Sequence, residues 1–460
     1  MARMRDNDFS IREIREIRGE KSCFGKIPFA PLRLCVLALN SSASRSRRWS
    51  EGEIKADSKP NQCARNRQIK AKQNKAKQNK VKQGCLRVFQ QNAPGGSPLG
   101  ACPSGGRRVT CARMIQKAYA AAGVDIDLGN RVKSALPQWL ASTRRREVLG
   151  QVGGFGGLFA LDVKKFRRPV LVSSMDGVGT KLKIAFAMDR HDTVGQDLVN
   201  HCVNDIAVLG AEPLFFLDYI GTGELKPRVF EQLMAGFARA CRENGCALIG
   251  GETAQMPGFY QEGEYDLSGT MVGVVEKADI LDGKGIRAGD AIIGLTSSGL
   301  HTNGYSLARK IFFERMKLTP NSVLPELQGS LGDELLKVHV SYGPLIQAVL
   351  KKFKGRSGIK GLAHITGGGF IDNVPRVLPK KCDAVIKKGS WEVLPIFQLL
   401  ADEGGVAEAE LYQVFNMGIG MTMIVASDKA DAALRFIRAR RQSAWCIGEI
   451  VRGTGQTKIV

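Results

Sequence analysis

Apolar and polar positions follow two recurring patterns along most of this chain. Short apolar runs at residues 169–172, 246–250, 270–275 and 291–296 are typical of buried strands. Residues 227–244 instead repeat apolar side chains every three or four positions, which predicts an amphipathic helix. Residues 207–218 predict the end of a helix, a turn and a further buried strand. From residue 114 onward the pattern therefore predicts an α+β or α/β protein in two halves.

Glycine and charged residues interrupt the strand-like runs at residues 283–289. We place a domain boundary there, with an N-terminal domain over residues 114–285 and a C-terminal α/β domain over residues 286–460. The total length of 460 residues would by itself suggest about three domains. The two patterned halves leave residues 1–113 to be explained separately.

Residues 1–113 lack the pattern of a folded domain. They contain a three-residue repeat at 11–18 and a five-residue repeat at 70–79, and they end in a segment rich in glycine and proline. They carry 25 Lys and Arg against 8 Asp and Glu, so most of the net charge of +23 lies here. Such a segment buries too little apolar surface to offset its ordering entropy, and we predict a disordered extension.

Three interpretations of this basic extension are open. Its arginine and serine content fits a targeting peptide, although more than 100 residues is long for one. Its charge also fits a nucleic-acid-binding tail. We favour the third interpretation, in which the start codon is placed too early and translation begins at Met114, just before the first organised sequence.

Beyond residue 113 the composition is that of an ordinary soluble enzyme. The remaining residues carry 42 basic and 36 acidic side chains. The 11 cysteines of the chain form no CxxC pair, and their odd number fits a reducing compartment. No apolar run reaches the roughly 18 residues of a membrane span. We expect a cytoplasmic protein without a membrane partner, or an organellar one if the extension is a targeting peptide.

Residues 173–181, SSMDGVGTK, lie between a predicted strand and a predicted helix. Gly177 and Gly179 allow a backbone to approach an anion closely, and free N–H groups at a helix start bind phosphate. Asp176 is a candidate Mg²⁺ ligand, and Lys181 can neutralise phosphate charge. The segment is not the GxxxxGK[ST] phosphate loop. Taken alone, it fits a plain turn with a solvated aspartate and lysine equally well.

A second glycine-rich element, GGFGG at residues 153–157, precedes Asp176 by about 20 residues. One interpretation is a mobile loop that closes over phosphates. The other is a flexible linker, because glycine clusters often mark plain loops.

Residues 192–205 carry carboxylates at helical spacing. Asp197, His201 and Asp205 recur every four residues, so they share one face if this segment is a helix. Together with Asp176 they offer the oxygen ligands that Mg²⁺ prefers, with phosphate oxygens completing the shell. The alternative is a helix cap and a solvated face. The apolar flanking residues count against it, since a buried Asp205 would need a partner.

Three later loops gather polar side chains beside glycines, each directly after a strand-like run. Ligands bind at this position in many α/β folds, and such side chains suit a sugar phosphate. A single histidine is usually structural, but two of only five histidines in this setting favour function. The loops are GGETAQMPG at 250–258, SSGLHTNGYS at 297–306 and AHITGGGF at 363–370.

Together these segments match one known family. SxDGVGTK, DLVxxCVNDIxxxGAEPLFFLDY, GGETAxMPG, SSGxHxNGYSLxRK, AHxTGGGFxxNxPRVLP and FNxGxGM occur in this order, after an opening YxxAGVDIDxGN at residues 119–130. The chain resembles the phosphoribosylformylglycinamidine cyclo-ligase family, also called aminoimidazole ribonucleotide synthetases, over about residues 119–455. Residues 1–113 lie outside the resemblance, which agrees with a start at Met114.

The resemblance implies a two-domain synthetase fold in which the N-terminal sheets of two subunits pair into the barrel-like core of a homodimer. It also implies a reaction of de novo purine biosynthesis, in which formylglycinamidine ribonucleotide and ATP give aminoimidazole ribonucleotide, ADP and phosphate, with Mg²⁺ as cofactor. Phosphorylation of the formamide oxygen gives an iminophosphate, and the amidine nitrogen then closes the ring. Because closure is intramolecular, the enzyme mainly supplies orientation and phosphoryl-transfer electrostatics.

The motifs and the chemistry together suggest a role for each candidate residue. The catalytic candidates are His301, first for proton handling, then Asp205 and Lys181. The metal candidates are Asp176, Asp205 and, after them, Asp197. The expected nucleotide contacts are Gly153, Gly154, Gly156, Gly157, Asp176, Gly177, Gly179, Thr180 and Lys181. The expected substrate contacts are Glu252, Thr302, Asn303, His364 and Thr366.

Two alternatives stand beside this interpretation. Selenophosphate synthetase, thiamine-monophosphate kinase and a hydrogenase-maturation dehydratase belong to the same superfamily and share the DG and ND elements, but none is expected to carry the whole motif set. In a different class, the basic extension could make the protein a nucleic-acid binder with salt-dependent affinity. We regard nucleic acid as an improbable partner.

Overall fold

The computed structural model describes residues 119–120, 122–150, 154–353 and 358–460. The expected extension over residues 1–113 lies outside the described residues, as do Met114 and Gly153. No helix in the described part of the chain is both long and apolar enough to cross a membrane.

The apolar runs of the first half form a four-stranded sheet. Its strands are β1 (Pro169–Gly177), β2 (Glu212–Thr222), β3 (Ala247–Gln255) and β4 (Tyr265–Glu276), in the order β1-β4-β2-β3. β4 is antiparallel to both β1 and β2, whereas β2 and β3 are parallel. The strands predicted in this half are confirmed, and each extends beyond the apolar run that indicated it.

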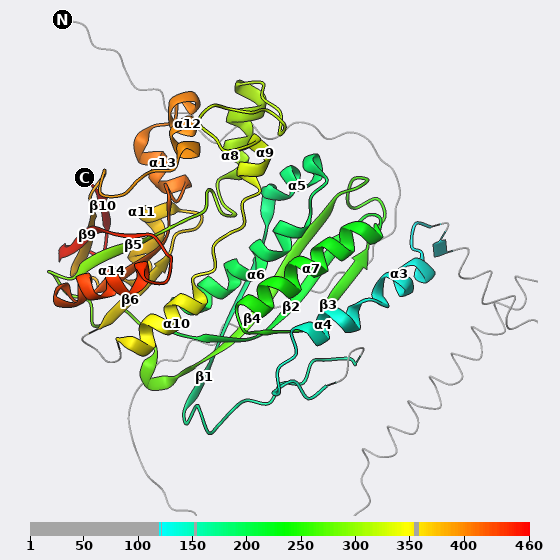
Figure 1. The fold of residues 1–460 in the computed structure, drawn as a ribbon, viewed down its shortest axis with the longest axis horizontal. Coiled ribbons are helices and arrows are strands. Elements are labelled where there is room, and N and C mark those ends of the chain that lie inside the picture. The colour runs from blue at the N-terminus through cyan, green and yellow to red at the C-terminus, as the bar shows by residue number, and fades with distance from the viewer. Residues whose placement is uncertain (1–118, 121, 151–153, 354–357) are drawn as a thin grey trace, which may run out of the picture. The chain divides into compact units, whose positions relative to one another are not determined.

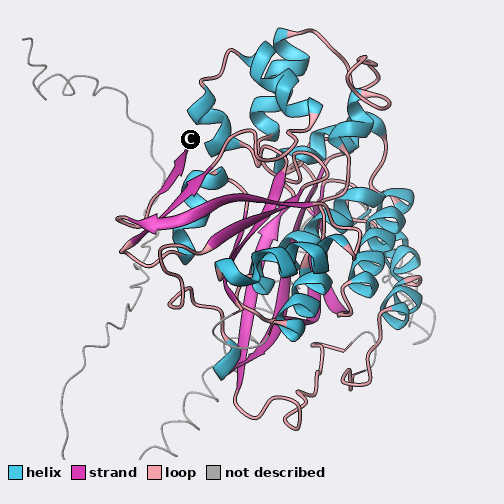
Figure 2. Cartoon of the chain, turned by 60° about the vertical axis from the view of Figure 1, so that its left-hand side comes forward, coloured by secondary structure: helices cyan, strands magenta, loops and turns pink. Residues whose placement is uncertain are grey.

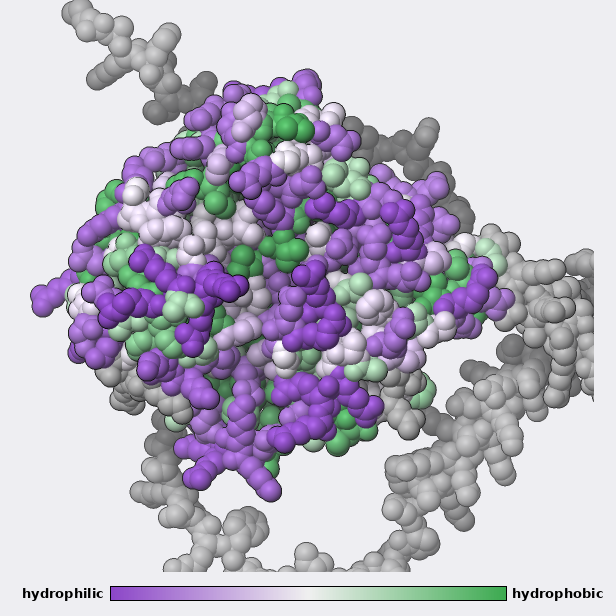
Figure 3. Space-filling model, viewed as in Figure 1, coloured by the Kyte–Doolittle hydropathy of each residue, from purple (hydrophilic) through white to green (hydrophobic). Residues whose placement is uncertain are grey.

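Helices cover one face of this sheet (Figure 1). The predicted helix at residues 227–244 is confirmed as α7 (Pro227–Glu243), which starts at a proline and buries Phe230, Leu233 and Phe237. α6 (Asp192–Ala207) packs beside it against β1, β2 and β4. The outer side of α7 is hydrophilic (Figure 3). The shorter helices of this half are α3 (Ile126–Lys133), α4 (Leu136–Ser142) and α5 (Leu182–Met188).

The opposite face of the same sheet is largely open. Side chains alternate along β1, so that Leu171 and Met175 point away from α6 and are 63% and 71% exposed. The segment before β1 covers only one end of this face, where Phe159 packs on Phe215 of β2 with ring centroids 5.3 Å apart. A strand with apolar residues on its exposed face is unusual unless something covers it.

The second half forms a six-stranded sheet in the order β10-β7-β9-β5-β8-β6. All neighbours are antiparallel except β10 and β7. The predicted strand at 291–296 is confirmed as β5, and the predicted boundary at 283–289 lies in the connection before it. The strands are β5 (Ala291–Thr296), β6 (Ile359–His364), β7 (Cys382–Ile386), β8 (Ile419–Val425), β9 (Ala444–Arg452) and β10 (Thr457–Ile459).

Helices pack against the strands of this sheet as well (Figure 2). They supply much of the second apolar core, in which Ile346 of α10 and Ile437 of α14 are completely buried. The helices are α8 (Tyr305–Arg309), α9 (Leu331–Leu335), α10 (Gly343–Lys352), α11 (Gly369–Asn373), α12 (Pro395–Gly404), α13 (Glu408–Val414) and α14 (Ala430–Arg438). α8 continues into a π-helical turn over Lys310–Arg315.

Candidate active site

Asp176 stands at the carboxyl end of β1. The turn expected around it is shorter than the sequence indicated, because Asp176 and Gly177 still belong to the strand and pair with Gly269 and Ser268 of β4. The chain turns only afterwards, at Gly179, whose φ of +66° lies in the left-handed region that favours glycine. The side chain of Asp176 is 37% exposed and points to the helix-covered side of the sheet.

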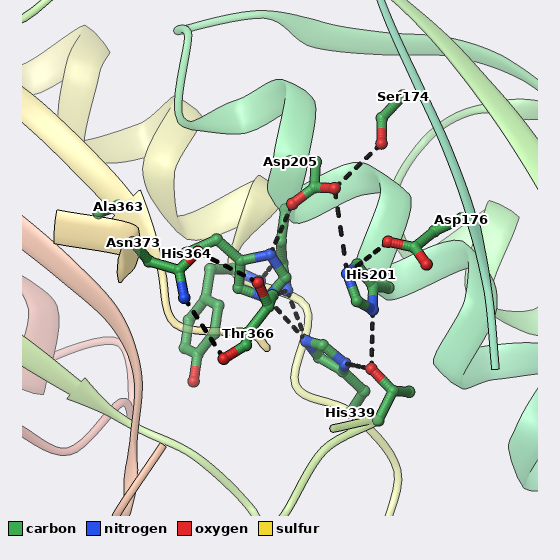
Figure 4. Close-up of polar contacts among 12 residues, drawn as sticks. Ser174, Asp176, His201, Asp205, His339, Ala363, His364, Thr366 and Asn373 are labelled. Atoms are coloured by element: carbon green, nitrogen blue, oxygen red, sulfur yellow. Dashed lines mark hydrogen bonds and ion pairs between the residues drawn. The ribbon is translucent and has the colours of Figure 1, made fainter. Parts of the chain in front are cut away.

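His201 of α6 holds this carboxylate. Its Nε2 lies 2.8 Å from Oδ2 of Asp176, and its Nδ1 lies 2.7 Å from Oγ1 of Thr302 (Figure 4). The backbone N–H of Gly177 donates to the other oxygen of Asp176 at 2.7 Å. The carboxylate is therefore fixed from two sides.

Asp205, one turn further along α6, is held in the same way by a second histidine. Nδ1 of His364, at the end of β6, lies 2.8 Å from Oδ1 of Asp205, and Ser174 of β1 donates its hydroxyl to Oδ2 at 3.0 Å (Figure 4). Nε2 of His364 lies 3.0 Å from Nε2 of His339. Asp205 is 32% exposed. The carboxylates of Asp176 and Asp205 thus lie side by side at the surface, in front of a buried group of imidazoles, and we call this pair of carboxylates the edge of the site.

The surroundings keep both carboxylates ionised. Burial by itself would raise the pKa of Asp176, but the hydrogen bond and charge of His201 outweigh it and lower the pKa. Burial likewise opposes ionisation of Asp205, and the contact with His364 more than offsets it, so that this pKa is also lowered. For His201, burial would lower the pKa, but the contact with Asp176 raises it. The edge thus offers two negative groups at neutral pH.

Lys181 and Asp197 do not join this edge, contrary to the sequence expectation. Both side chains are completely buried, and Nζ of Lys181 lies 2.7 Å from Oδ2 of Asp197. Nζ also donates to the carbonyl oxygens of His301 and Lys337 at 3.0 and 2.7 Å. A lysine so enclosed cannot contact a phosphate, and Asp197 has no oxygen directed at solvent for a metal. Lys181 was expected as a phosphate contact and catalytic group, and Asp197 as a metal ligand. The structure instead shows the two residues paired with each other in the interior.

His301 is also placed differently from its expected role in proton handling. Its imidazole is buried, and Nε2 accepts from the backbone N–H groups of Ser298 and Val340 at 3.2 and 3.4 Å. Burial lowers its pKa well below the ordinary value, so the ring is neutral. The ring stacks on His339 with centroids 3.9 Å apart. These contacts make His301 a packing residue of the loop rather than an accessible acid or base.

The expected substrate contacts divide into buried and accessible residues. Thr302 and His364 are buried and contact other side chains of the site. Asn303, Thr366 and Glu252 are partly or fully exposed and can meet a ligand. Asn303 lies beside the loop of Thr366, since a Cβ added at Gly367 would approach its Oδ1 to 3.1 Å. Thr180, expected among the nucleotide contacts, is exposed on the turn after β1.

The glycine segment is not brought to Asp176 within one chain. Gly157 packs closely on Ile249 of β3, where a Cβ would approach the side chain to 2.6 Å. Phe159, two residues later, packs on Phe215, which by alternation along β2 faces away from α6 and α7. Gly157 and Phe159 thus lie on the open side of the sheet, opposite the Asp176 side chain.

A cavity of about 120 Å³ lies beside Glu252. Asp218 of β2 is almost completely buried beside it, and burial raises the pKa of this carboxyl group to about 7, with the charge of Glu252 adding to the effect. Leu136, Leu140, Met234 and Leu248 give the cavity apolar walls, while Gly250 and Gly251 form its floor along β3. Asp218 shares a row across the sheet with Gly269 and Asp176.

Several of these residues escaped sequence reasoning. The sequence indicates His201 only as a member of a helix face, and no local pattern indicates His339, Ser174 or Asp218. Four of the five histidines of the chain, all except His191, gather here with ring centroids 3.9–5.2 Å apart. The rarity of histidine was the one available indication for His339, which has no glycine or threonine next to it.

The edge fits a divalent cation. Asp176 and Asp205 are about one third exposed and ionised, and they come from different elements that meet at this edge. Each ionised carboxylate has about four lone-pair sites, which the contacts described above do not exhaust. Hard oxygen donors of this kind are what Mg²⁺ prefers, with phosphate oxygens and water completing the shell.

Comparisons with known proteins identify the family and the fold. The family description "AIR synthase related protein, N-terminal domain" matches residues 163–275, and the corresponding C-terminal domain matches residues 287–460. Among solved structures, a thiamine-monophosphate kinase from Stenotrophomonas maltophilia K279a has a TM-score of 0.54 at 17% identity, covering 71% of this chain and 95% of its own. The hydrogenase maturation protein HypE in complex with ATP has a TM-score of 0.52 at 18% identity, covering 72% and 90%. At such identities these two structures show only that the fold is shared. The two matched domains place the chain in the class of two-domain AIR synthase related proteins.

Closer relatives narrow this class. A phosphoribosylformylglycinamidine cyclo-ligase from Syntrophotalea carbinolica is 53% identical over 334 residues, which cover 73% of this chain and 94% of the relative. One from Geobacillus thermodenitrificans is 52% identical over 339 residues, covering 74% and 97%. The chain belongs to the phosphoribosylformylglycinamidine cyclo-ligase family. The resemblance and the synthetase fold expected from the sequence are thereby confirmed.

Proposed function

We propose that this ligase of purine biosynthesis binds ATP with Mg²⁺ at the edge formed by Asp176 and Asp205. The observation that carries the proposal is the convergence of two ionised, partly exposed carboxylates from β1 and α6, each held by a buried imidazole. The exposed turn at Gly179 and Thr180, next to this edge, is available for phosphate oxygens. Mg²⁺, when bound by the two aspartates, would neutralise charge on the phosphoryl group during transfer.

The reaction is the ATP-dependent cyclisation of formylglycinamidine ribonucleotide to aminoimidazole ribonucleotide. The formamide oxygen forms a bond to the terminal phosphorus of ATP as the bond to ADP breaks. The amidine nitrogen of the same molecule then attacks the activated carbon, and phosphate leaves with the former formamide oxygen. Loss of a proton from nitrogen completes the ring. Asn303 and Thr366 are our candidates for orienting this substrate, and orientation is the main requirement of an intramolecular closure.

The cavity beside Glu252 is our candidate for the base of ATP. Its apolar walls suit a flat ring, and Asp218, with a pKa of about 7, can donate a hydrogen bond to a ring nitrogen when protonated. The row from Asp176 through Gly269 and Asp218 to Gly251 crosses three strand spacings, or roughly 14 Å. A nucleoside triphosphate can bridge that span along the sheet, with its phosphates at the aspartate edge.

We also propose a homodimer in which a second copy of the chain covers the open face of the N-terminal sheet. Leu171 and Met175 give this face its exposed apolar side chains. Gly157 and Phe159 lie on the same side, so in a dimer this end of the glycine segment would face the partner rather than its own Asp176. We therefore propose that this segment contacts phosphate in the site of the second copy and not in the site of its own chain.

A cytoplasmic location belongs to the same proposal. Cys202, Cys241, Cys246 and Cys382 are buried free thiols, and Cys446 is an exposed one. An exposed free thiol is typical of proteins from a reducing compartment.

The test is the Asp205→Asn variant. Removing one negative charge from the edge should abolish ATP-dependent ring closure, measured as formation of aminoimidazole ribonucleotide and ADP, while the circular dichroism spectrum stays that of the folded protein. Asp431→Asn, at an exposed position on α14, is the matched control and should keep full turnover. Near-normal turnover of Asp205→Asn would remove the assignment of this edge.

A further inference from the structure

The two carboxylates of the edge are joined through the interior of the protein. Starting from Asp176, contacts run to His201 at 2.8 Å, from His201 to Thr302 at 2.7 Å and from Thr302 to His339 at 3.3 Å. They continue from His339 to His364 at 3.0 Å and from His364 to Asp205 at 2.8 Å (Figure 4). We call His201, Thr302, His339 and His364 the imidazole network.

The network fixes the direction of each ring it contains. His201, His339 and His364 each use both ring nitrogens in it, so no ring can turn without breaking a contact at its other end. All four members are buried, whereas the two aspartates at its ends are about one third exposed. Buried polar groups are costly when unpaired, so the network holds one arrangement.

The network also spans the two halves of the chain. Asp176, His201 and Asp205 come from β1 and α6, whereas Thr302, His339 and His364 come from the second half. The amide of Asn204 adds a further tie from α6, since its Nδ2 lies 3.2 Å from Nε2 of His339 and donates to the carbonyl of Val340 at 2.8 Å. The second half therefore supplies contacts that orient the two imidazoles beside the carboxylates, and His201 itself lies 2.8 Å from Asp176 and 4.0 Å from Asp205.

We propose that Thr302 and His339 are positioning residues, which touch neither carboxylate but set the separation and direction of Asp176 and Asp205 through His201 and His364. The inference rests on the proposed binding of Mg²⁺ and nucleotide at this edge. It assigns Thr302 to the interior of the site instead of to the substrate cleft. The relative placement of Asp176 and Asp205 would matter most if both carboxylates held the same cation. The effect of breaking the network should thus fall on the metal-dependent part of nucleotide binding.

Thr302→Val tests this with little change of shape. Titration calorimetry with a non-hydrolysable ATP analogue, in Mg²⁺ and in EDTA, gives the factor by which Mg²⁺ tightens nucleotide binding. We expect this factor to fall about fivefold to tenfold in Thr302→Val, the effect of a lost hydrogen bond, and to recover largely in Thr302→Ser. Thr422→Val removes an equally buried hydroxyl, which donates only to the carbonyl of Ala363, and should leave the factor unchanged.

A measurement on the wild-type protein does not depend on a variant folding. Adding Mg²⁺ and the ATP analogue to ¹⁵N-histidine-labelled protein should shift the ring resonances of His339 more than those of His191, which contacts Tyr265 and Asp189 outside the network. Equal shifts, or an unchanged Mg²⁺ factor in Thr302→Val, would overturn the inference. A wild-type protein whose nucleotide binding ignores Mg²⁺ would instead contradict the proposed function itself.

Discussion

At the scale of single residues, the surroundings of an aspartate decide what it can do. Asp176 and Asp205 meet histidines at a half-open edge, and their lowered pKa values keep them charged. Asp197 meets Lys181 in a closed interior, where burial raises its pKa and the ion pair opposes that rise. Asp218 meets an apolar cavity, and its pKa rises to about 7. Chemically identical side chains thus become an accessible charged group, a buried ion-pair partner and an acid with a pKa of about 7.

Asp218 should make stability depend on pH. Its pKa in the folded protein, about 7, lies above the ordinary value of 3.8, so the folded state holds the proton more tightly. The stability that this contributes is fully present below about pH 4 and is lost as the pH rises through about 7. Asp218→Asn has no such loss. We therefore compare the unfolding free energy of Asp218→Asn with that of wild type at two pH values. The variant minus the wild type should be roughly 2–3 kcal/mol larger at pH 8 than at pH 5.

Urea unfolding of both proteins at the two pH values measures this difference. A relative stability that is the same at pH 5 and pH 8 would show that Asp218 titrates near its ordinary pKa. Asp431→Asn, exposed on α14, should follow the wild type at both values.

At the scale of elements, α6 is a buried helix with a polar side. Oδ1 of Asp197 accepts from the backbone N–H of His339, and Asn200 donates to the carbonyl of the same residue, at 2.7 and 2.8 Å. One turn later, Asn204 accepts from the N–H of Tyr342 at 2.8 Å. Spacings of three and four residues put these side chains on one side of the helix. α6 therefore binds the backbone of residues 339–342 and joins the second half to the first.

The ion pair between Lys181 and Asp197 stabilises this contact between the two halves. Lys181→Met leaves the Asp197 charge buried without its partner, and we expect a loss of about 3–5 kcal/mol in unfolding free energy by urea denaturation. The double variant Lys181→Met/Asp197→Leu removes both charges and should lose less than the single one. Lys183→Met, on the partly exposed side of α5, is the control and should cost under about 1 kcal/mol. A single variant as stable as wild type would contradict the buried pair.

At the scale of the whole molecule, the N-terminal sheet has one face covered by helices and one face left open. The open face carries Leu171 and Met175 along β1, and it lies on the side of the glycine segment. An exposed apolar sheet face is expected to be covered, and a second copy of the same sheet provides a matching surface. The proposed dimer would thus complete both the core and the site.

Met175→Asp should dissociate this dimer. Burying an unpaired carboxylate in an apolar sheet contact is costly, so we expect sedimentation to give the mass of one chain instead of two at micromolar concentration. Val323→Asp makes the same change at an exposed apolar residue of the second half and should leave the mass unchanged. A dimer that survives Met175→Asp would place the interface elsewhere.

Local patterns along the chain were enough to predict several strands, one long helix and the family. Strands such as β5 and the helix α7 follow from side-chain periods of two and 3.6, which are local properties of the chain. The motifs around Asp176, Asp205 and Glu252 indicated the cyclo-ligase family for the same reason, since each lies within a short segment. The structure brings Asp176 and Asp205, both predicted from the sequence as metal candidates, to one edge, and their binding role stays a proposal.

Which polar side chains remain accessible depends on contacts between segments far apart in the sequence. Lys181 lies five residues from Asp176 but is enclosed by Asp197 and by the carbonyls of the second half. His339 meets His201 across 138 residues of sequence, and no local pattern connects them. Burial and long-range hydrogen bonds depend on the packing of both halves together, and a period or a motif contains no information about that packing.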